Sequence, residues 1–169
     1  MDRSLLPAQL QHHGTVVKLL LEGLTPLERT WKPAPEKWCP LEVVCHLLDE
    51  EREDFRARLH STLETPEAPW PKIDPAAWVL ERRYMEQDFQ ATLNAFLVER
   101  ERSLDWLRGQ EHAQWANVYL HPKVGPVSCE LLLTNWVAHD LHHIRQLINL
   151  RYAYLAGSTT VPLDYAGKW

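Results

Sequence analysis

The stretch WVAHDLHHIRQLINL at residues 136–150 carries the clearest pattern in the chain. Its apolar residues recur every three or four positions, which is typical of an amphipathic helix. His139 and His143 are four residues apart, so their side chains should lie about 5 to 6 Å apart on one helical face. That face also carries Leu132, Trp136, Gln146 and Leu150. We therefore expect the two imidazoles to face the interior of the protein.

Three further segments share this helical spacing, and alternation with period two is nearly absent. We expect four helices, at Ser4–Leu24 with Ser4 as its cap, Pro40–Leu63, Asp74–Leu107 and Ser128–Leu155. Proline-rich segments should separate the first three helices. The link EHAQWANVYLHPKVGPV at residues 111–127 is expected to be irregular.

The length of the chain limits its organisation. At 169 residues, it is expected to form one domain over residues 1–169. Four long amphipathic helices in a single domain predict an all-α fold, and the natural packing of such helices is a four-helix bundle.

The composition indicates which classes of partner to expect and in which cellular compartment the protein lies. The formal net charge is −5, with 18 Lys plus Arg against 23 Asp plus Glu, so nucleic acid is not an expected partner. No apolar run has the length of a membrane span or a signal peptide, and no membrane partner is expected. The three cysteines are odd in number and widely spaced, which indicates free thiols in a reducing compartment. We expect a cytoplasmic protein.

The paired histidines raise a metal-site hypothesis. Two inward imidazoles need polar partners, because an unsatisfied buried polar group costs about 1 to 3 kcal/mol, and one bound cation would satisfy both. The alternative is that they are ordinary core or surface histidines. A third ligand would come from His46, which shares a side of the second helix with Asp49, Glu50 and Glu53. These four residues could equally form a solvated polar face.

Other side chains near the candidate ligands have possible supporting roles. Asp49, Glu50 and Asp140 are within one helical turn of them and could accept hydrogen bonds from their outer ring nitrogens. Trp38 and Trp136 could wall a cavity for a small-molecule substrate. By contrast, Cys45 and Cys129 are expected to be buried inert thiols, and His12 and His13 are expected at the surface.

Two segments of the chain match a known family. WCPLEVVCHLLDEE at residues 38–51 and HPKVGPVSCELLLTNWVAHDLHHIRQL at residues 121–147 resemble the signature segments of the DinB-like (YfiT-like) superfamily. The matching positions are Trp38, Glu42, His46 and Asp49 in the first segment, and His121, Gly125, His139, Asp140, His143 and Gln146 in the second. Cys39 departs from the pattern, which usually has Ser or Thr there.

The resemblance implies an up-down-down-up four-helix bundle, often a homodimer, with a divalent metal ion bound by three histidines. On this chain those ligands would be His46, His139 and His143. Zinc and nickel are both associated with such sites, and neutral imidazoles suit either ion. Several relatives activate a low-molecular-weight thiol for S-transfer, and others are described as metal-dependent hydrolases.

Several functions follow from these observations. The first is a metal-dependent S-transferase that uses a low-molecular-weight thiol as cosubstrate, with a metal-dependent hydrolase as its alternative. Another is a stress-associated metal-binding protein without turnover, and a further one is a structural helical module in which the histidines are incidental. A cavity beside the metal would favour an enzyme, whereas a site closed by Trp136 would favour the binding protein.

Overall fold

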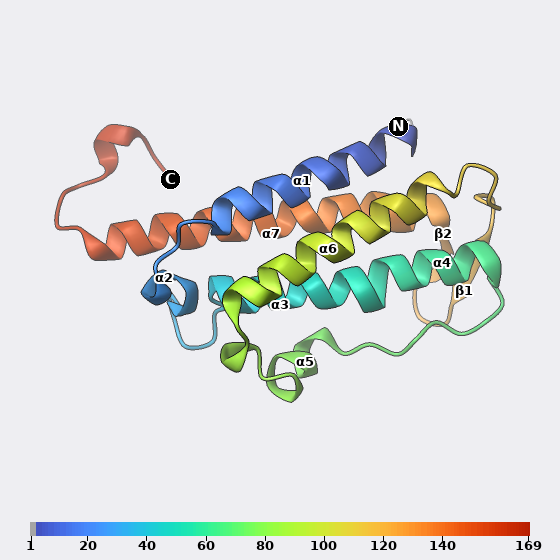
Figure 1. The fold of residues 1–169 in the computed structure, drawn as a ribbon, viewed down its shortest axis with the longest axis horizontal. Coiled ribbons are helices and arrows are strands. Elements are labelled where there is room, and N and C mark those ends of the chain that lie inside the picture. Colours follow the sequence, from blue (N-terminus) through green and yellow to red (C-terminus); the bar gives the residue numbers. More distant parts are fainter. Residues whose placement is uncertain (1–2) are drawn as a thin grey trace.

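The computed structural model describes residues 3–169, which form four long helical stretches packed side by side (Figure 1). The stretches are α1 (Leu6–Leu21), the continuous run α3 (Pro40–Asp49), η2 (Glu50–Phe55) and α4 (Arg56–Glu64), then α6 (Phe89–Arg108) and α7 (Cys129–Ser158). The shorter elements are η1 (Arg3–Leu5), α2 (Pro26–Thr30), α5 (Pro75–Glu81), η3 (Tyr84–Glu86), β1 (Val118–His121), β2 (Gly125–Ser128) and η4 (Asp164–Ala166).

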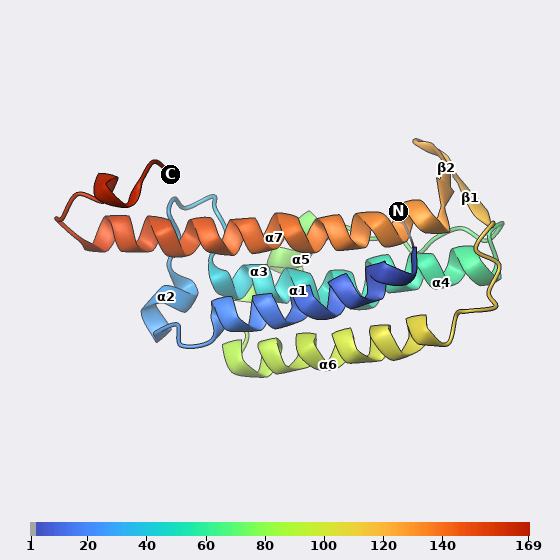
Figure 2. The ribbon, with the colours of Figure 1, turned by 90° about the horizontal axis from the view of Figure 1, so that it is seen from above.

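The four stretches have up-down-down-up topology. α1 and α7 run parallel to each other, and the α3–α4 run and α6 point the opposite way (Figures 1 and 2). The long crossover at residues 65–88, which includes α5, carries the chain from the end of α4 back to the end of the bundle where α3 begins, and α6 starts there. The expected all-α four-helix bundle is therefore confirmed.

The first helix is shorter than the sequence predicts. α1 begins after η1 with Leu5 at its N-cap, which makes no side-chain cap hydrogen bond, so the predicted Ser4 cap is wrong. The helix ends at Leu21, and Gly23 follows with a positive φ of 78°, a conformation that favours glycine. The prolines after α1 do more than separate helices, because Pro26 is itself the first residue of the short helix α2. A capping box between Thr25 and Glu28 stabilises the start of α2.

The second predicted helix is present but irregular. It begins at Pro40, where the Cys39 backbone N–H donates to the Glu42 carboxylate at 2.9 Å. Glu42 thus caps the start of the helix, although Cys39 stands where the family pattern usually has Ser or Thr. Residues 50–55 form a π-helical turn, which periodicity did not predict.

The third predicted helix is two separate helices. α5 ends at Glu81, and α6 begins at Phe89 with the Asp88 carboxylate accepting from the Ala91 N–H at 2.6 Å. Between them, Arg83 has a φ of 48°, a left-handed conformation that a helix cannot include. The break leaves α5 against α3, with Trp78 in the apolar core, and lets α6 pack beside α1 and α3.

The predicted irregular link contains a β-hairpin. β1 pairs with β2 in antiparallel register, with His121 opposite Gly125. The His121 Nδ1 accepts from the backbone N–H groups of Lys123 and Val124 at 3.2 Å each, which stabilises the turn. α7 then begins at Cys129, one residue after the predicted start at Ser128, and the Ser128 hydroxyl caps it by accepting from the Leu131 N–H. It ends at Ser158, three residues beyond the prediction.

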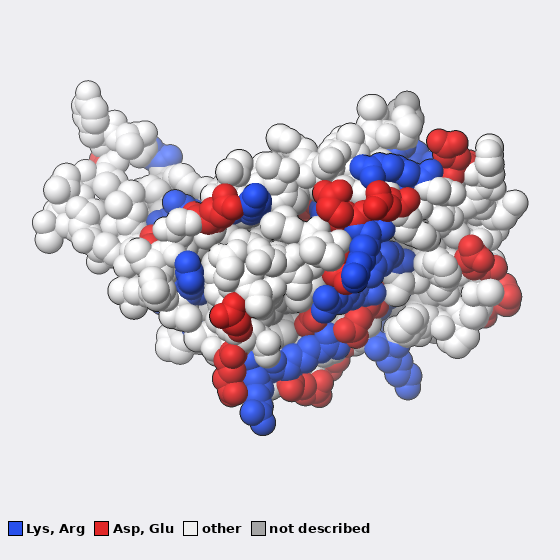
Figure 3. All heavy atoms as spheres, in the orientation of Figure 1, with Lys and Arg blue, Asp and Glu red and all other residues white. Residues whose placement is uncertain are grey.

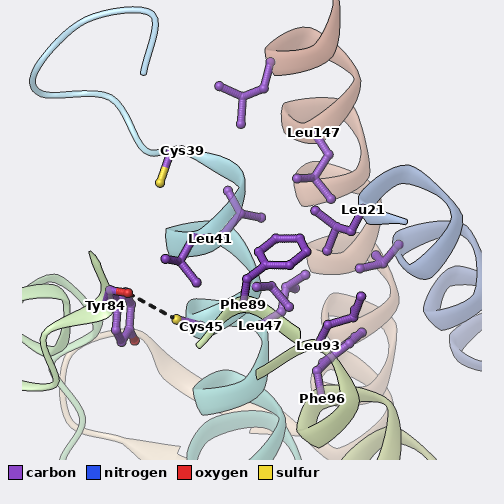
Figure 4. Packing of buried hydrophobic residues seen from close by; sticks show 14 of the residues in the cluster. Leu21, Cys39, Leu41, Cys45, Leu47, Tyr84, Phe89, Leu93, Phe96 and Leu147 are labelled. Atoms are coloured by element: carbon purple, nitrogen blue, oxygen red, sulfur yellow. Dashed lines mark hydrogen bonds between the residues drawn. The ribbon is translucent and has the colours of Figure 1, made fainter. Parts of the chain in front are cut away.

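The apolar core is divided into two clusters. The first includes Leu21, Leu41, Leu47, Phe89 and Phe96 (Figure 4). The second includes Leu10, Leu59, Leu104, Trp136 and Val137. Buried polar groups lie between the two clusters along the helices, since Arg100 follows Phe96 and precedes Leu104, and Asp140 lies between Val137 and Ile144.

Arg100 is the centre of this polar layer. Its guanidinium donates to Glu51 at 2.9 and 3.0 Å and to Asp140 at 2.5 and 2.9 Å. α1 approaches closely because Gly14 has no side chain, and a Cβ there would lie 3.3 Å from the Arg100 Cγ. His13 also lies in this layer, with Nδ1 3.6 Å from Asp140. The surface placement expected for His13 is therefore wrong.

The charged surface gives no sign of a nucleic-acid site on the face drawn in Figure 3. Lysine and arginine are interspersed there with aspartate and glutamate, so the face has no continuous basic patch. Within residues 3–169, no helix combines the length and the apolarity that crossing a bilayer requires.

Candidate metal centre

Three histidines from two helical stretches meet at the level of the polar layer. His46 lies on α3, and His139 and His143 lie one turn apart on α7. The Nε2 of His139 is 3.2 Å from that of His46 and 3.1 Å from that of His143. Their possible ligand atoms all lie within 4.8 Å of one another. The residues that sequence analysis singled out are thus brought together.

The arrangement fits a metal ion. Two nitrogens bound to one tetrahedral zinc ion at about 2.0 to 2.1 Å would be about 3.3 Å apart. The two shorter Nε2 separations, 3.2 and 3.1 Å, are close to this value. Three imidazoles also leave the further coordination position that catalytic zinc sites keep open.

The outer ring nitrogens indicate which tautomers can present Nε2 to a cation. His143 Nδ1 lies 2.8 Å from Gln146 Oε1, so an Nδ1 proton donates to this oxygen and leaves Nε2 as a free ligand. His46 Nδ1 faces Glu50 Oε1 at 3.8 Å. Both atoms of the second pair are buried and have no hydrogen-bond partner.

Burial keeps the cluster uncharged. Desolvation, followed by the nearby His143 and His139, lowers the pKa of His46 to about 2. Desolvation and His143 lower the pKa of His139 to about 3, and desolvation also lowers the pKa of His143. Neutral imidazoles are the form that binds metal ions. Burial, with the neighbouring Asp54, raises the pKa of Glu50 to about 8.

Of the three acidic residues proposed to support the ligands, only Glu50 faces a ring nitrogen of the cluster. Asp49 instead accepts from the Tyr84 hydroxyl at 2.5 Å and pairs with Arg82 at 2.8 Å. Asp140 pairs with Arg100. Both expectations are corrected for the same reason: segments distant in the chain supply arginines, Arg82 just after α5 and Arg100 on α6, that the sequence alone could not place.

The two tryptophans also differ. The Trp38 ring lies 4.9 Å from that of His46 and is nearly parallel to that of His143, 6.4 Å away. Trp136 is fully buried, and its Nε1–H donates to Glu51. It reaches the site only through Phe55, which stacks on Trp136 and contacts the His139 ring. The expectation that Trp136 lines a cavity is thus wrong, because its ring belongs to the core.

A cavity of about 910 Å³ opens beside the histidines. His139, His143 and Trp38 form the wall nearest the cluster. The other lining residues come from the loop before α3 and from α7, and they are Pro33, Ala34, Glu36, Lys37, His142, Arg145, Gln146, Asn149, Leu150 and Ala153. Trp136 does not close the site, so a small molecule can reach it.

Sequence reasoning missed several contributors. The role of Gln146 could have been found from its position three residues after His143, since that spacing places both on one face. Phe55 gave no such signal, because its contact with His139 depends on the π-helical turn. Lys37 and Arg145 both line the cavity, but they are far apart in the chain, so the sequence could not show that they belong to one site.

Comparison with known families identifies one family over most of the chain. The family model of the DinB superfamily matches residues 9–147. The chain belongs to the DinB superfamily. The match includes His46, His139 and His143, so all three histidines of this DinB superfamily protein lie within the family region. Among curated proteins, none matches the chain.

Solved structures include a similar fold. YfiT from Bacillus subtilis matches with a TM-score of 0.78 and 20% sequence identity, over 89% of this chain and 87% of that chain. YfiT is described as "a probable metal-dependent hydrolase with an unusual four-helix bundle topology". The match shows that this DinB superfamily protein has the same bundle topology.

Proposed function

We propose that this protein is a divalent-metal-dependent enzyme that transfers a low-molecular-weight thiol to a small electrophilic substrate. The observation that carries the proposal is the convergence of three histidines, two of them buried and His139 half-buried, beside an open cavity of about 910 Å³. A protein that only sequestered the ion would not need this access. The open cavity therefore favours an enzyme over a non-catalytic stress-associated metal-binding protein.

The chain supplies the ligands and the walls of this site. His46, His139 and His143 would hold zinc or nickel through Nε2, with Gln146 fixing the orientation of His143. When bound, such an ion lowers the pKa of a thiol or water and polarises a carbonyl group. Trp38 presents a flat apolar surface to a bound molecule, next to the ligand rings.

The lining of the cavity favours a thiol over water as the nucleophile. Hydrolysis benefits from a general base near the attacking water, but Glu36 is the only carboxylate among the described residues that line the cavity, and Glu50 lies behind His46. A thiol is acidic enough to ionise beside a cation without such a base. Its sulfur forms a bond to the electrophilic carbon, the leaving group departs with the electron pair, and the thiol proton passes to water in the open cavity.

Hydrolysis is the second candidate. Its support is the likeness to YfiT, which is described as a probable metal-dependent hydrolase. The same three ligands would serve either reaction, and the small number of carboxylates on the cavity wall, with Glu36 alone among the described lining residues, is the feature that ranks hydrolysis second.

The test compares both reactions on metal-loaded protein. Zinc- and nickel-loaded samples would be assayed for thiol conjugation to chlorodinitrobenzene with a panel of low-molecular-weight thiols, and for hydrolysis of nitrophenyl acetate. We expect conjugation that is lost in His143→Ala and retained in His112→Ala, since His112 is exposed and does not line the cavity. Ester hydrolysis without conjugation would favour the second candidate, and metal binding without either reaction would favour the binding protein.

The homodimer implied by the family resemblance remains a prediction. Sedimentation of the purified protein would check it, with a mass of twice 19.8 kDa expected.

A further inference from the structure

We propose that Glu50 is a positioning residue that fixes the His46 ring by accepting a hydrogen bond from its Nδ1–H. The inference rests on the proposed function, because it assumes that His46 binds a metal ion through Nε2. It assigns to Glu50 a role that Asp49 and Asp140, the other acidic neighbours of the ligands, do not share.

The first argument is the tautomer that ligation requires. If Nε2 of His46 binds a cation, the ring proton must be on Nδ1, and a buried N–H needs an acceptor. Glu50 Oε1 lies 3.8 Å from Nδ1, and both atoms are buried without a hydrogen-bond partner. A shift of about 0.8 Å would bring them to ordinary hydrogen-bond length. One small movement would therefore satisfy two buried polar atoms.

The second argument is that the other acids of this segment are already paired with arginine. Glu51 binds Arg100, Glu53 binds Arg82 and Asp54 binds Arg58. Glu50 makes no ion pair with an arginine within the described residues, and its carboxyl group neighbours Asp54 on one side and His46 on the other. Its Oε1, the oxygen that faces His46, is buried without a hydrogen-bond partner, which is costly and which a role towards a ligand would explain.

The third argument is the local backbone. Glu50 is the first residue of the π-helical turn Glu50–Phe55, and π-helical turns within α-helices are frequent at functional sites. The last residue of the same turn, Phe55, contacts the His139 ring at 5.1 Å between ring centroids. The π-helical turn therefore begins with a residue that faces His46 and ends with one that contacts His139. An acceptor oxygen is needed whether the carboxyl group is protonated or not, so the role does not depend on its ionisation.

The test distinguishes the effect of the length of the Glu50 side chain from the effect of its charge. Glu50→Gln keeps the length of the side chain and an acceptor oxygen but removes the charge, and Glu50→Asp keeps the charge but withdraws the oxygen by one methylene group. Asp49→Asn, in the same helix but bound to Tyr84, is the matched control. Zinc affinity would be measured for each by competition with a chromophoric chelator, and the cobalt(II) absorption spectrum would report the geometry of the ligands.

We expect Glu50→Asp to bind zinc about 10- to 100-fold more weakly than the parent, with an altered cobalt spectrum. Glu50→Gln should stay within about threefold, and Asp49→Asn should be unchanged. The reverse order, with Gln weaker than Asp, would show that charge matters and would overturn the positioning role. Parental affinity in Glu50→Asp would also overturn it, while leaving the proposed function intact. Failure of the parent protein to bind any divalent metal would overturn both.

Discussion

His46 Nε2 on α3 lies 3.2 Å from His139 Nε2 on α7, although 93 residues separate them in the chain. The contact exists because α3 packs against α7, at the level where the polar layer interrupts the apolar core. The structure of either helix by itself does not bring these two nitrogens together. The topology of the bundle is therefore what creates the candidate metal centre.

Removal of Gln146 should weaken metal binding without abolishing it. Gln146→Leu deletes the acceptor that lies 2.8 Å from His143 Nδ1, so the ring loses its fixed tautomer and orientation. We expect zinc affinity to fall by about tenfold or more, measured by chelator competition. Asn149→Leu, further along the same cavity wall, should bind zinc like the parent. Equal affinities in the two variants would contradict the role of Gln146.

Trp38 and Trp136 should respond differently to substitution. Trp38→Ala removes a cavity wall, so KM should rise by roughly threefold to tenfold while zinc content stays the same. Trp136→Phe replaces the buried indole with a smaller ring and removes its hydrogen bond to Glu51, so it should lower the free energy of unfolding and leave KM nearly unchanged. Steady-state kinetics and chemical denaturation of both variants would check this. A raised KM in the Trp136 variant alone would contradict the assignment.

Breaking the Arg100 network should strongly destabilise the bundle. Arg100→Met leaves Glu51 and Asp140 buried without their cation, so we expect a loss of about 3 to 5 kcal/mol in the free energy of unfolding. Adding Glu51→Gln and Asp140→Asn to this variant removes both uncompensated charges and should recover part of the loss. Urea denaturation would measure both changes, and a loss below about 1 kcal/mol for the single variant would refute the account.

The cysteines should be unreactive in the folded protein. Burial raises the pKa of Cys39 to about 11 and that of Cys45 to about 12, from 9.0. Below pH 9 both thiols stay protonated, and all three cysteines are buried, so iodoacetamide should label the native protein slowly and the denatured protein at three sites. Because the pKa values of these thiols are higher in the folded protein than in the unfolded chain, the two cysteines do not lower the free energy of unfolding below pH 9. The free energy of unfolding falls as the pH rises from 9 towards 12. Rapid native labelling at neutral pH would contradict the prediction.

Much of the bundle was predictable because its information is local. The 3.6-residue period located all four helical stretches, and Ser128 marked the start of α7. The failures occurred where tertiary packing decides the backbone. The left-handed Arg83 divides the third predicted helix, and the π-helical turn at residues 50–55 interrupts the second without any mark in the hydrophobic pattern.

The candidate site was predictable only in part. The spacing of His139 and His143 identified one half from helical geometry. The position of His46 on the second helix made it a candidate third ligand, and the family resemblance pointed to the same residue. The environment of the acids was not predictable, because a run such as EEREDF is usually a solvated face, whereas Glu50, Glu51 and Asp54 are buried here. Their partners Arg100 and Arg58 lie on another helix or beyond the irregular turn.

The most direct test of the three-histidine metal centre is the metal content of untagged protein, measured by mass spectrometry beside His143→Ala purified in the same way. His142→Ala, an exposed neighbour, serves as the control. The account predicts about one zinc or nickel ion per chain in the parent and in His142→Ala, and loss of the ion in His143→Ala. No stoichiometric metal in the parent after reconstitution, or full occupancy in His143→Ala, would contradict it.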